Sequence, residues 1–154
     1  MNLDPNPVHG VLNRLISAFW QGTVQHQTHL AVIKALGLSS LATQMQAHIA
    51  DEPATLQQLT DRLLDLDGRP SFTLAVPQLG STLPEVLHLD LATQLEARPV
   101  LNAAAEAVAA AHDAVTRRLI EDILADEEAH LSWLKSELNL LERMGERAYI
   151  AGRS

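Results

Sequence analysis

Cysteine is absent from this chain of 154 residues. Without thiols neither a disulfide framework nor a thiolate metal site can form, so any metal chemistry must use oxygen and nitrogen ligands. No stretch approaches the roughly 18 uncharged apolar residues that a membrane span requires, and the first residues lack a basic start followed by an apolar run. We therefore expect a cytoplasmic protein with no membrane partner.

Basic residues are also scarce. The chain has 11 Lys and Arg against 19 Asp and Glu, which gives a formal net charge of −8. Nucleic-acid binding usually needs a basic face, so this balance argues against nucleic acid as a main partner. An acidic protein attracts cations instead.

Aromatic and β-branched residues are sparse, whereas Ala, Leu, Gln and Glu recur with apolar residues three and four apart. This period is typical of helices and predicts an all-α protein. Four long segments are predicted, at 7–36, 39–67, 83–112 and 113–144, followed by a short C-terminal helix. Short connections predict two antiparallel hairpins, while 68–82 is long enough to cross the length of a bundle. We expect one domain over 1–154, a ferritin-like four-helix bundle with one crossover.

Polar residues interrupt the apolar stripes of these segments near mid-length. Glu127 and His130 lie on the core-facing stripe of the fourth segment, where the Glu-x-x-His spacing puts both on one helix face. Such groups are costly in a core unless they are paired, protonated or bound to metal. Two readings stay open: a metal site and a mutually satisfied buried pair. Glu52 interrupts the second stripe and Gln94 the third.

The first segment carries histidines instead of a carboxylate at this level, where Phe19 stands. His26 and His29 lie three residues apart on one face and are interpreted as core or pocket histidines. His26 is about 10 Å along the helix from Phe19, too far to replace a carboxylate there. His48 and Glu52 are four apart and predict either a substitute metal pair or a surface hydrogen bond.

The run 123–145, Ile-Leu-Ala-Asp-Glu-Glu-Ala-His-Leu-Ser-Trp-Leu-Lys-Ser-Glu-Leu-Asn-Leu-Leu-Glu-Arg-Met-Gly, resembles the fourth helix of bacterioferritins nearly residue for residue. The start 12–15, the corner 36–38, the exit 66–70 and the pieces 90–92 and 112–113 match in order, so the resemblance covers about 8–150. It implies an iron-storage cage whose subunits oxidise Fe(II) with dioxygen or peroxide.

The resemblance implies a di-iron centre with six ligands, but this chain departs from it. The six positions hold Phe19, Glu52, Thr55, Gln94, Glu127 and His130. Glu52, Glu127 and His130 are the family's residues, and the neutral oxygen of Gln94 is a weak fourth donor. Phe19 and Thr55 remove the terminal ligands of one iron. What remains predicts at most one tightly held ion per subunit.

Two further positions depart from the family. Pro53 stands where the resemblance implies the methionine that ligates haem, so no haem ligand is predicted from this chain, and His26 replaces a tyrosine that many relatives hold beside the iron. Pro53 and Pro99 lie inside predicted helices, where each removes a backbone hydrogen bond and predicts a kink.

These residues predict an iron-storage cage subunit with weak or no ferroxidase activity, working beside ligand-complete bacterioferritin subunits. One alternative is a purely structural subunit of a mixed shell. Another is a ferritin-like bundle that binds a different ligand in its core, with Phe19 and Trp20 lining a drier pocket.

Overall fold

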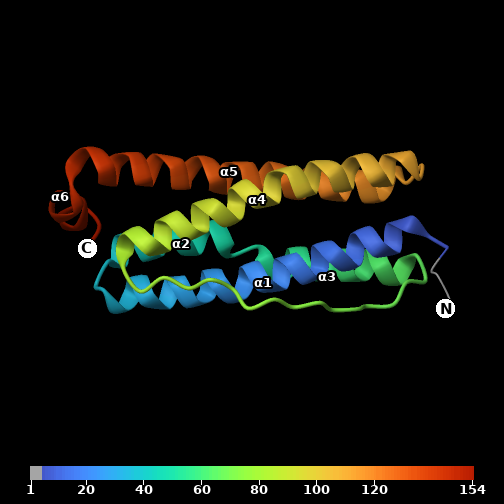
Figure 1. The fold of residues 1–154 in the computed structure, drawn as a ribbon, viewed down its shortest axis with the longest axis horizontal. Helices are drawn as coiled ribbons and strands as arrows, with labels where there is room; N and C mark the ends of the chain where they lie inside the picture. Colours follow the sequence, from blue (N-terminus) through green and yellow to red (C-terminus); the bar gives the residue numbers. More distant parts are fainter. Residues whose placement is uncertain (1–4) are drawn as a thin grey trace.

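The computed structural model describes residues 5–154, and these form helices joined by turns and one long crossover, without a β-strand (Figure 1). The all-α prediction is therefore confirmed. The helices are α1 (Pro7–Ala35), α2 (Ser39–Ile49), α3 (Glu52–Asp65), α4 (Leu83–Ala110), α5 (Ala114–Met144) and the short α6 (Glu146–Ala151). None of these helices is long and apolar enough to cross a membrane.

The arrangement is a four-helix bundle with one crossover, as predicted. α1 forms a hairpin with α2 and α3, and α4 forms a hairpin with α5 (Figure 1). Between α3 and α4 the chain runs back along the bundle without regular structure, so that α4 begins at the end of the bundle where α2 lies (Figure 1). α1 also packs against α4, which joins the two hairpins.

The second predicted segment, 39–67, is wrong as a single helix. α2 ends at Ile49 and α3 begins at Glu52, with Pro53 in its first turn. A first-turn proline is tolerated because its missing N–H has no partner inside the helix there, so Pro53 marks a helix start and not an interior kink. Pro99, by contrast, lies inside the continuous α4 as predicted.

Two apolar clusters fill the bundle, one at each end. The first contains residues of α2, the start of α4, the end of α5 and α6, and the second contains the start of α1, α3, the end of α4 and the start of α5. In α1, α4 and α5 the stretch between the clusters carries buried polar side chains. They include Gln25, His26, His29, Asp90, Gln94 and His130. The bundle therefore has a polar layer at mid-length.

His29 fastens the crossover to this layer. Its Nδ1 lies 2.6 Å from Asp90 Oδ1 on α4, and the backbone N–H of Gly80 donates to its Nε2 at 2.9 Å. A Cβ at residue 80 would come within 2.8 Å of the backbone N of Val86, so only glycine fits this close approach. The end of the crossover is thus held against both α1 and α4.

Candidate functional site

Three of the four predicted ligands line a small cavity in the polar layer. Glu52 from α3, Gln94 from α4 and Glu127 from α5 all line a cavity of about 60 Å³. His130 is not among the lining residues but bonds to Gln94, as described below. The remaining lining residues are Ala18, Phe19, Gly22, His26, Thr93 and Ala97. Three of the four predicted residues are therefore brought together, with His26 as an additional member of the lining and His130 bonded to Gln94.

Glu52 already has protein partners on both oxygens. Thr23 Oγ1 donates to Oε2 at 2.7 Å, and His26 Nδ1 lies 2.7 Å from Oε1. Burial disfavours the charged form of His26, but the hydrogen bond with Glu52 and the surrounding carboxylates outweigh it, so the pKa of His26 is raised. The carboxylate is engaged by α1 and is not free to bridge two metal ions.

His130 is held as an acceptor. Gln94 Nε2 donates to its Nδ1 at 3.1 Å, which places the proton of the neutral ring on Nε2. Burial, with the nearby His26 and His48, lowers the pKa of His130 to about 3, so the ring is neutral at pH 7. With this tautomer and amide orientation, neither ring nitrogen presents a free lone pair.

The carboxyl of Glu127 has fewer hydrogen-bond partners in the centre than that of Glu52. Burial and the charge of Glu52 raise its pKa to about 7, although His26 and a hydrogen bond from Gln94 act in the opposite direction. Near neutral pH this carboxyl is therefore partly protonated, and a cation placed beside it would favour the carboxylate.

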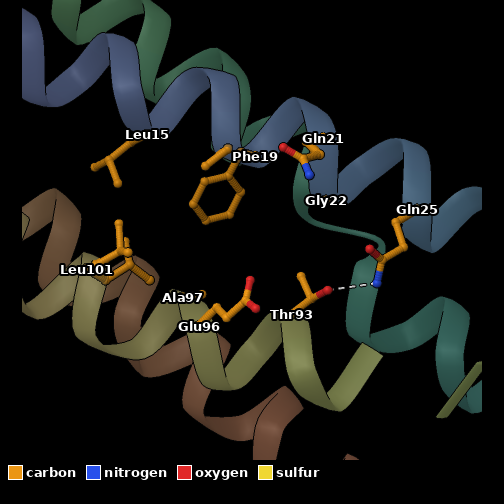
Figure 2. A pocket seen from close by; sticks show the side chains of 11 residues that line it. Leu15, Phe19, Gln21, Gly22, Gln25, Thr93, Glu96, Ala97 and Leu101 are labelled. Atoms are coloured by element: carbon orange, nitrogen blue, oxygen red, sulfur yellow. Dashed lines mark hydrogen bonds between the residues drawn. The ribbon is translucent and has the colours of Figure 1, made fainter. Parts of the chain in front are cut away.

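Phe19 lines both this cavity and a larger pocket between α1 and α4. That pocket has a volume of about 200 Å³, and the residues that it shares with the smaller cavity are Ala18, Phe19, Gly22, Thr93 and Ala97. Figure 2 shows the ring of Phe19 extending from α1 towards α4, beside Glu96 and Ala97. Phe19 thus puts an apolar ring where the resemblance implies a terminal iron ligand.

Trp20 does not line this centre. It is 43% exposed and faces a separate groove with Pro53 and Leu56, between α1 and α3. The expectation that Trp20 would help to make a dry core pocket is wrong, because the following residue on a helix points about 100° away from Phe19.

The side chains as arranged do not fit a close pair of iron ions. Among residues 5–154, no three His, Asp or Glu side chains form a group that could hold a metal ion. Phe19 and the buried Thr55 stand at two of the six positions, and Glu52 is held by His26 and Thr23. The prediction of a single ion at Glu127, His130, Glu52 and Gln94 stays a prediction.

Several contacts of the centre were not predicted from the sequence. His26 and Thr23 bond to Glu52 across the hairpin. His48 stacks on His130 with ring centroids 5.2 Å apart and also lies against Trp133. The 26-residue separation of His26 and Glu52 gives no periodic signal, since the contact depends on how α1 and α3 pack. The one signal in the sequence was His26 itself, which stands where the resemblance implies a tyrosine.

An all-α bundle with one long crossover, in which the long helices contribute side chains to a buried polar layer, defines a ferritin-like protein. The family model described as a ferritin-like domain matches residues 10–144. The chain is 33% identical to the bacterioferritin of Streptomyces coelicolor over 98% of its length and 90% of that protein. It is 32% identical to the bacterioferritin of Mycobacterium avium, over 98% of this chain and 95% of that one.

Solved structures agree. The fold matches the crystal structure of BfrA from M. tuberculosis with a TM-score of 0.90 and 30% identity, covering 98% of this chain and 94% of that one. A mycobacterial bacterioferritin structure matches with a TM-score of 0.91 at 32% identity, covering 99% and 95% of the two chains. The chain belongs to the bacterioferritin family.

Proposed function

We propose that this chain is a subunit of an iron-storage cage and has weak or no ferroxidase activity of its own. The observation that carries the proposal is the state of Glu52, whose two oxygens are bonded to His26 and Thr23. A carboxylate held in this way cannot bridge two irons unless both bonds are given up. The family membership supports storage, and the arrangement of the centre argues against fast oxidation.

Oxidation of a coupled iron pair requires two adjacent metal positions with their own ligands. Here a phenyl ring and a threonine stand at the positions that would supply the terminal ligands of one iron. At most one tightly bound ion per subunit is expected. If it uses the predicted set, Glu52 must exchange His26 for the ion and the Gln94 amide must release Nδ1 of His130.

We further propose that the chain shares its cage with ligand-complete bacterioferritin subunits in the cytoplasm. Features that govern folding are kept, including the hairpins, the crossover and the C-terminal helix, while the chemical positions have changed together. Relaxed constraint on the centre alone is expected of a subunit whose neighbour oxidises the iron. A common cavity lets the mineral form from iron that either subunit admits.

Co-expression with a ligand-complete bacterioferritin tests this proposal. With a different affinity tag on each chain, two successive purifications should yield one assembly that contains both. In the matched control, two copies of this chain that carry different tags are co-expressed. The yield of assemblies with both tags reports the efficiency of self-assembly. Strict sorting into two separate cages would contradict the mixed shell. A role in storage would be contradicted if the assembly of this chain alone took up no iron even with an active bacterioferritin in the same solution.

A further inference from the structure

The larger pocket between α1 and α4 has an apolar end and a polar end. Its volume is about 200 Å³, and its lining includes Leu15, Leu101, Gln21, Gln25 and Glu96. Figure 2 shows the two leucines at one end and the two glutamines at the other. Sites for drug-sized molecules measure roughly 300–1,000 Å³, so a ligand that fits this pocket is small and has both an apolar and a polar part.

The amide of Gln25 turns its carbonyl oxygen away from the protein groups that hold it. Its Nε2 donates to Thr93 Oγ1 at 2.8 Å and to Asp90 Oδ1 at 3.0 Å. Both oxygens act as acceptors, since Thr93 gives its own proton to the carbonyl of Leu89 and a carboxylate has none to give. Among residues 5–154, nothing donates to Gln25 Oε1, although only 5% of this residue is exposed. A nearly buried carbonyl oxygen of this kind calls for a donor.

Two further features of the pocket favour a positive charge. Glu96 forms neither an ion pair nor a hydrogen bond with any residue that the structure describes, and Figure 2 shows its carboxylate directed from α4 towards the ring of Phe19. An aromatic ring attracts a cation that lies over its face. No Lys, Arg or His lines the pocket, so the carboxylate has no basic neighbour in the lining.

Gly22 keeps the pocket open at a cost to α1. It lies in the interior of this helix, where glycine is less stable than alanine by roughly 1 kcal/mol. A Cβ at this position would meet nothing within 4 Å, and the backbone has no positive φ, so neither packing nor conformation within the chain requires glycine. Gly22 lines the pocket, and a longer side chain here would enter it.

We propose that this pocket binds a small organic cation, a primary ammonium on a compact apolar body. Its three N–H donors match the carboxylate of Glu96 and the amide oxygens of Gln25 and Gln21. The positive charge lies against the ring of Phe19, and the apolar body packs at the end that contains Leu101. The proposal holds whether or not the cage stores iron.

Other classes of ligand fit the lining less well. An anion would face Glu96 with no basic residue to pair with it. A divalent metal ion takes four or more ligands, and the lining offers one carboxylate and no histidine. A neutral apolar molecule would leave Gln25 Oε1 and the carboxylate without donors, which costs binding free energy.

Calorimetric titration of the purified full-length protein with benzylammonium at low ionic strength tests the site. We expect saturable binding of one molecule per subunit. Benzyl alcohol, which has the same ring without the charge, should bind at least about tenfold more weakly, and benzoate should not bind. Glu96→Gln should weaken benzylammonium about three- to tenfold. Glu106→Gln is the matched control, since this residue is also on α4 but does not line the pocket, and it should leave the affinity unchanged.

Substitution of Gly22 tests the location of the site. Gly22→Leu should abolish the binding, because its side chain fills the pocket, and Gly22→Ala should weaken it less. Both residues are better helix formers than glycine, and circular dichroism checks that the variants fold. The proposal would be overturned if benzylammonium showed no saturable binding to the unmodified protein, if benzyl alcohol bound equally well, or if folded Gly22→Leu kept the original affinity.

Discussion

Two histidines three residues apart on α1 have different surroundings. His29 is satisfied at both ring nitrogens, by Asp90 and by the backbone of Gly80, whereas His26 is satisfied only at the nitrogen that faces Glu52. The first is therefore a structural residue that fastens the crossover. The second pairs with Glu52 and leaves its Nε2 without a protein partner.

His29→Ala should lower the free energy of unfolding by about 3 kcal/mol or more, because it leaves the buried Asp90 without its closest partner and releases Gly80. Urea denaturation followed by circular dichroism measures the change. His88→Ala, an exposed histidine on the same bundle, is the control and should change stability by less than about 0.5 kcal/mol. Equal effects of the two substitutions would show that the His29 contacts are not made in solution.

Pro53 leads to a spectroscopic prediction. It lies in the first turn of α3, beside the groove that also contains Trp20, and it has no atom that can ligate iron. Reconstitution of the homo-assembly with haem should therefore give no Soret band of bis-methionine character. A ligand-complete bacterioferritin treated in parallel is the positive control, and the appearance of that band in this protein would contradict the prediction.

The sequence located most of the centre but not its internal bonds. Glu52, Gln94 and Glu127 were predicted because each interrupts an apolar stripe, and all three line one cavity. The bond between His26 and Glu52 could not be predicted, since it depends on the axial offset of α1 against α3 and on side-chain rotamers. The same holds for the stacking of His48 on His130.

At the scale of single helices, the ends explain what periodicity left open. The apolar stripe continues through 39–67 and predicts one helix. The helix itself is interrupted at Ala50 and Asp51, and Pro53 lies in the first turn of the next helix, α3. The stripe persists because the apolar faces of both helices are buried, that of α2 in the cluster at one end of the bundle and that of α3 in the cluster at the other. Asp51 precedes α3 but makes no side-chain cap, so the start of α3 is marked by Pro53 in its first turn.

Asp113 caps the N-terminus of α5 and should make stability depend on acid pH. It accepts from the backbone N–H of Thr116 at 2.9 Å and pairs with Arg62. Partial burial alone would raise its pKa, but the bonds from Thr116 and Arg62 outweigh burial and lower the pKa below its ordinary value of 3.8. Such a group stabilises the fold above its unfolded-state pKa and loses this contribution as pH falls through its lowered folded-state pKa.

Asp113→Asn should therefore be less stable than the unmodified protein near pH 6, by about 1 kcal/mol. The difference should shrink as pH falls from about 4 towards 2, the interval below the ordinary Asp pKa. Urea denaturation of both proteins across this range measures it. A difference that is constant with pH would show that the cap does not depend on the carboxylate.

Tyr149 fixes α6 to the end of α5. Its hydroxyl donates to the buried Glu137, which Arg153 also contacts at 2.9 Å, and burial together with Glu137 raises the tyrosine pKa well above its usual range. Tyr149→Phe should cost about 1–2 kcal/mol of stability, because Glu137 loses one of its donors. Thermal denaturation tests this, with the exposed Arg147→Ala as control. An unchanged melting temperature would contradict a role for the hydroxyl.

At the scale of the whole molecule, the two apolar clusters stabilise the bundle at its ends. The residue types of the polar layer between them can therefore vary. The positions that differ from the implied ligand set can change without loss of the fold, because Phe19 alone among them packs against an apolar cluster. The fold class and the crossover could be predicted from patterning alone. The hydrogen bonds within the polar layer could not be predicted in this way, because they depend on how the helices pack.

The central proposal is that this chain has weak or no ferroxidase activity of its own, and dioxygen consumption by the pure homo-assembly after addition of Fe(II) tests it most directly. The control variant combines Phe19→Glu, Thr55→His and Gln94→Glu with His26→Tyr, which restores the implied ligands and releases Glu52 from its histidine. We predict slow consumption by the unmodified protein and a rate at least about tenfold higher in the folded variant, equivalent to roughly 1.4 kcal/mol of barrier. Rapid consumption by the unmodified protein, with two irons bound per subunit, would contradict the account.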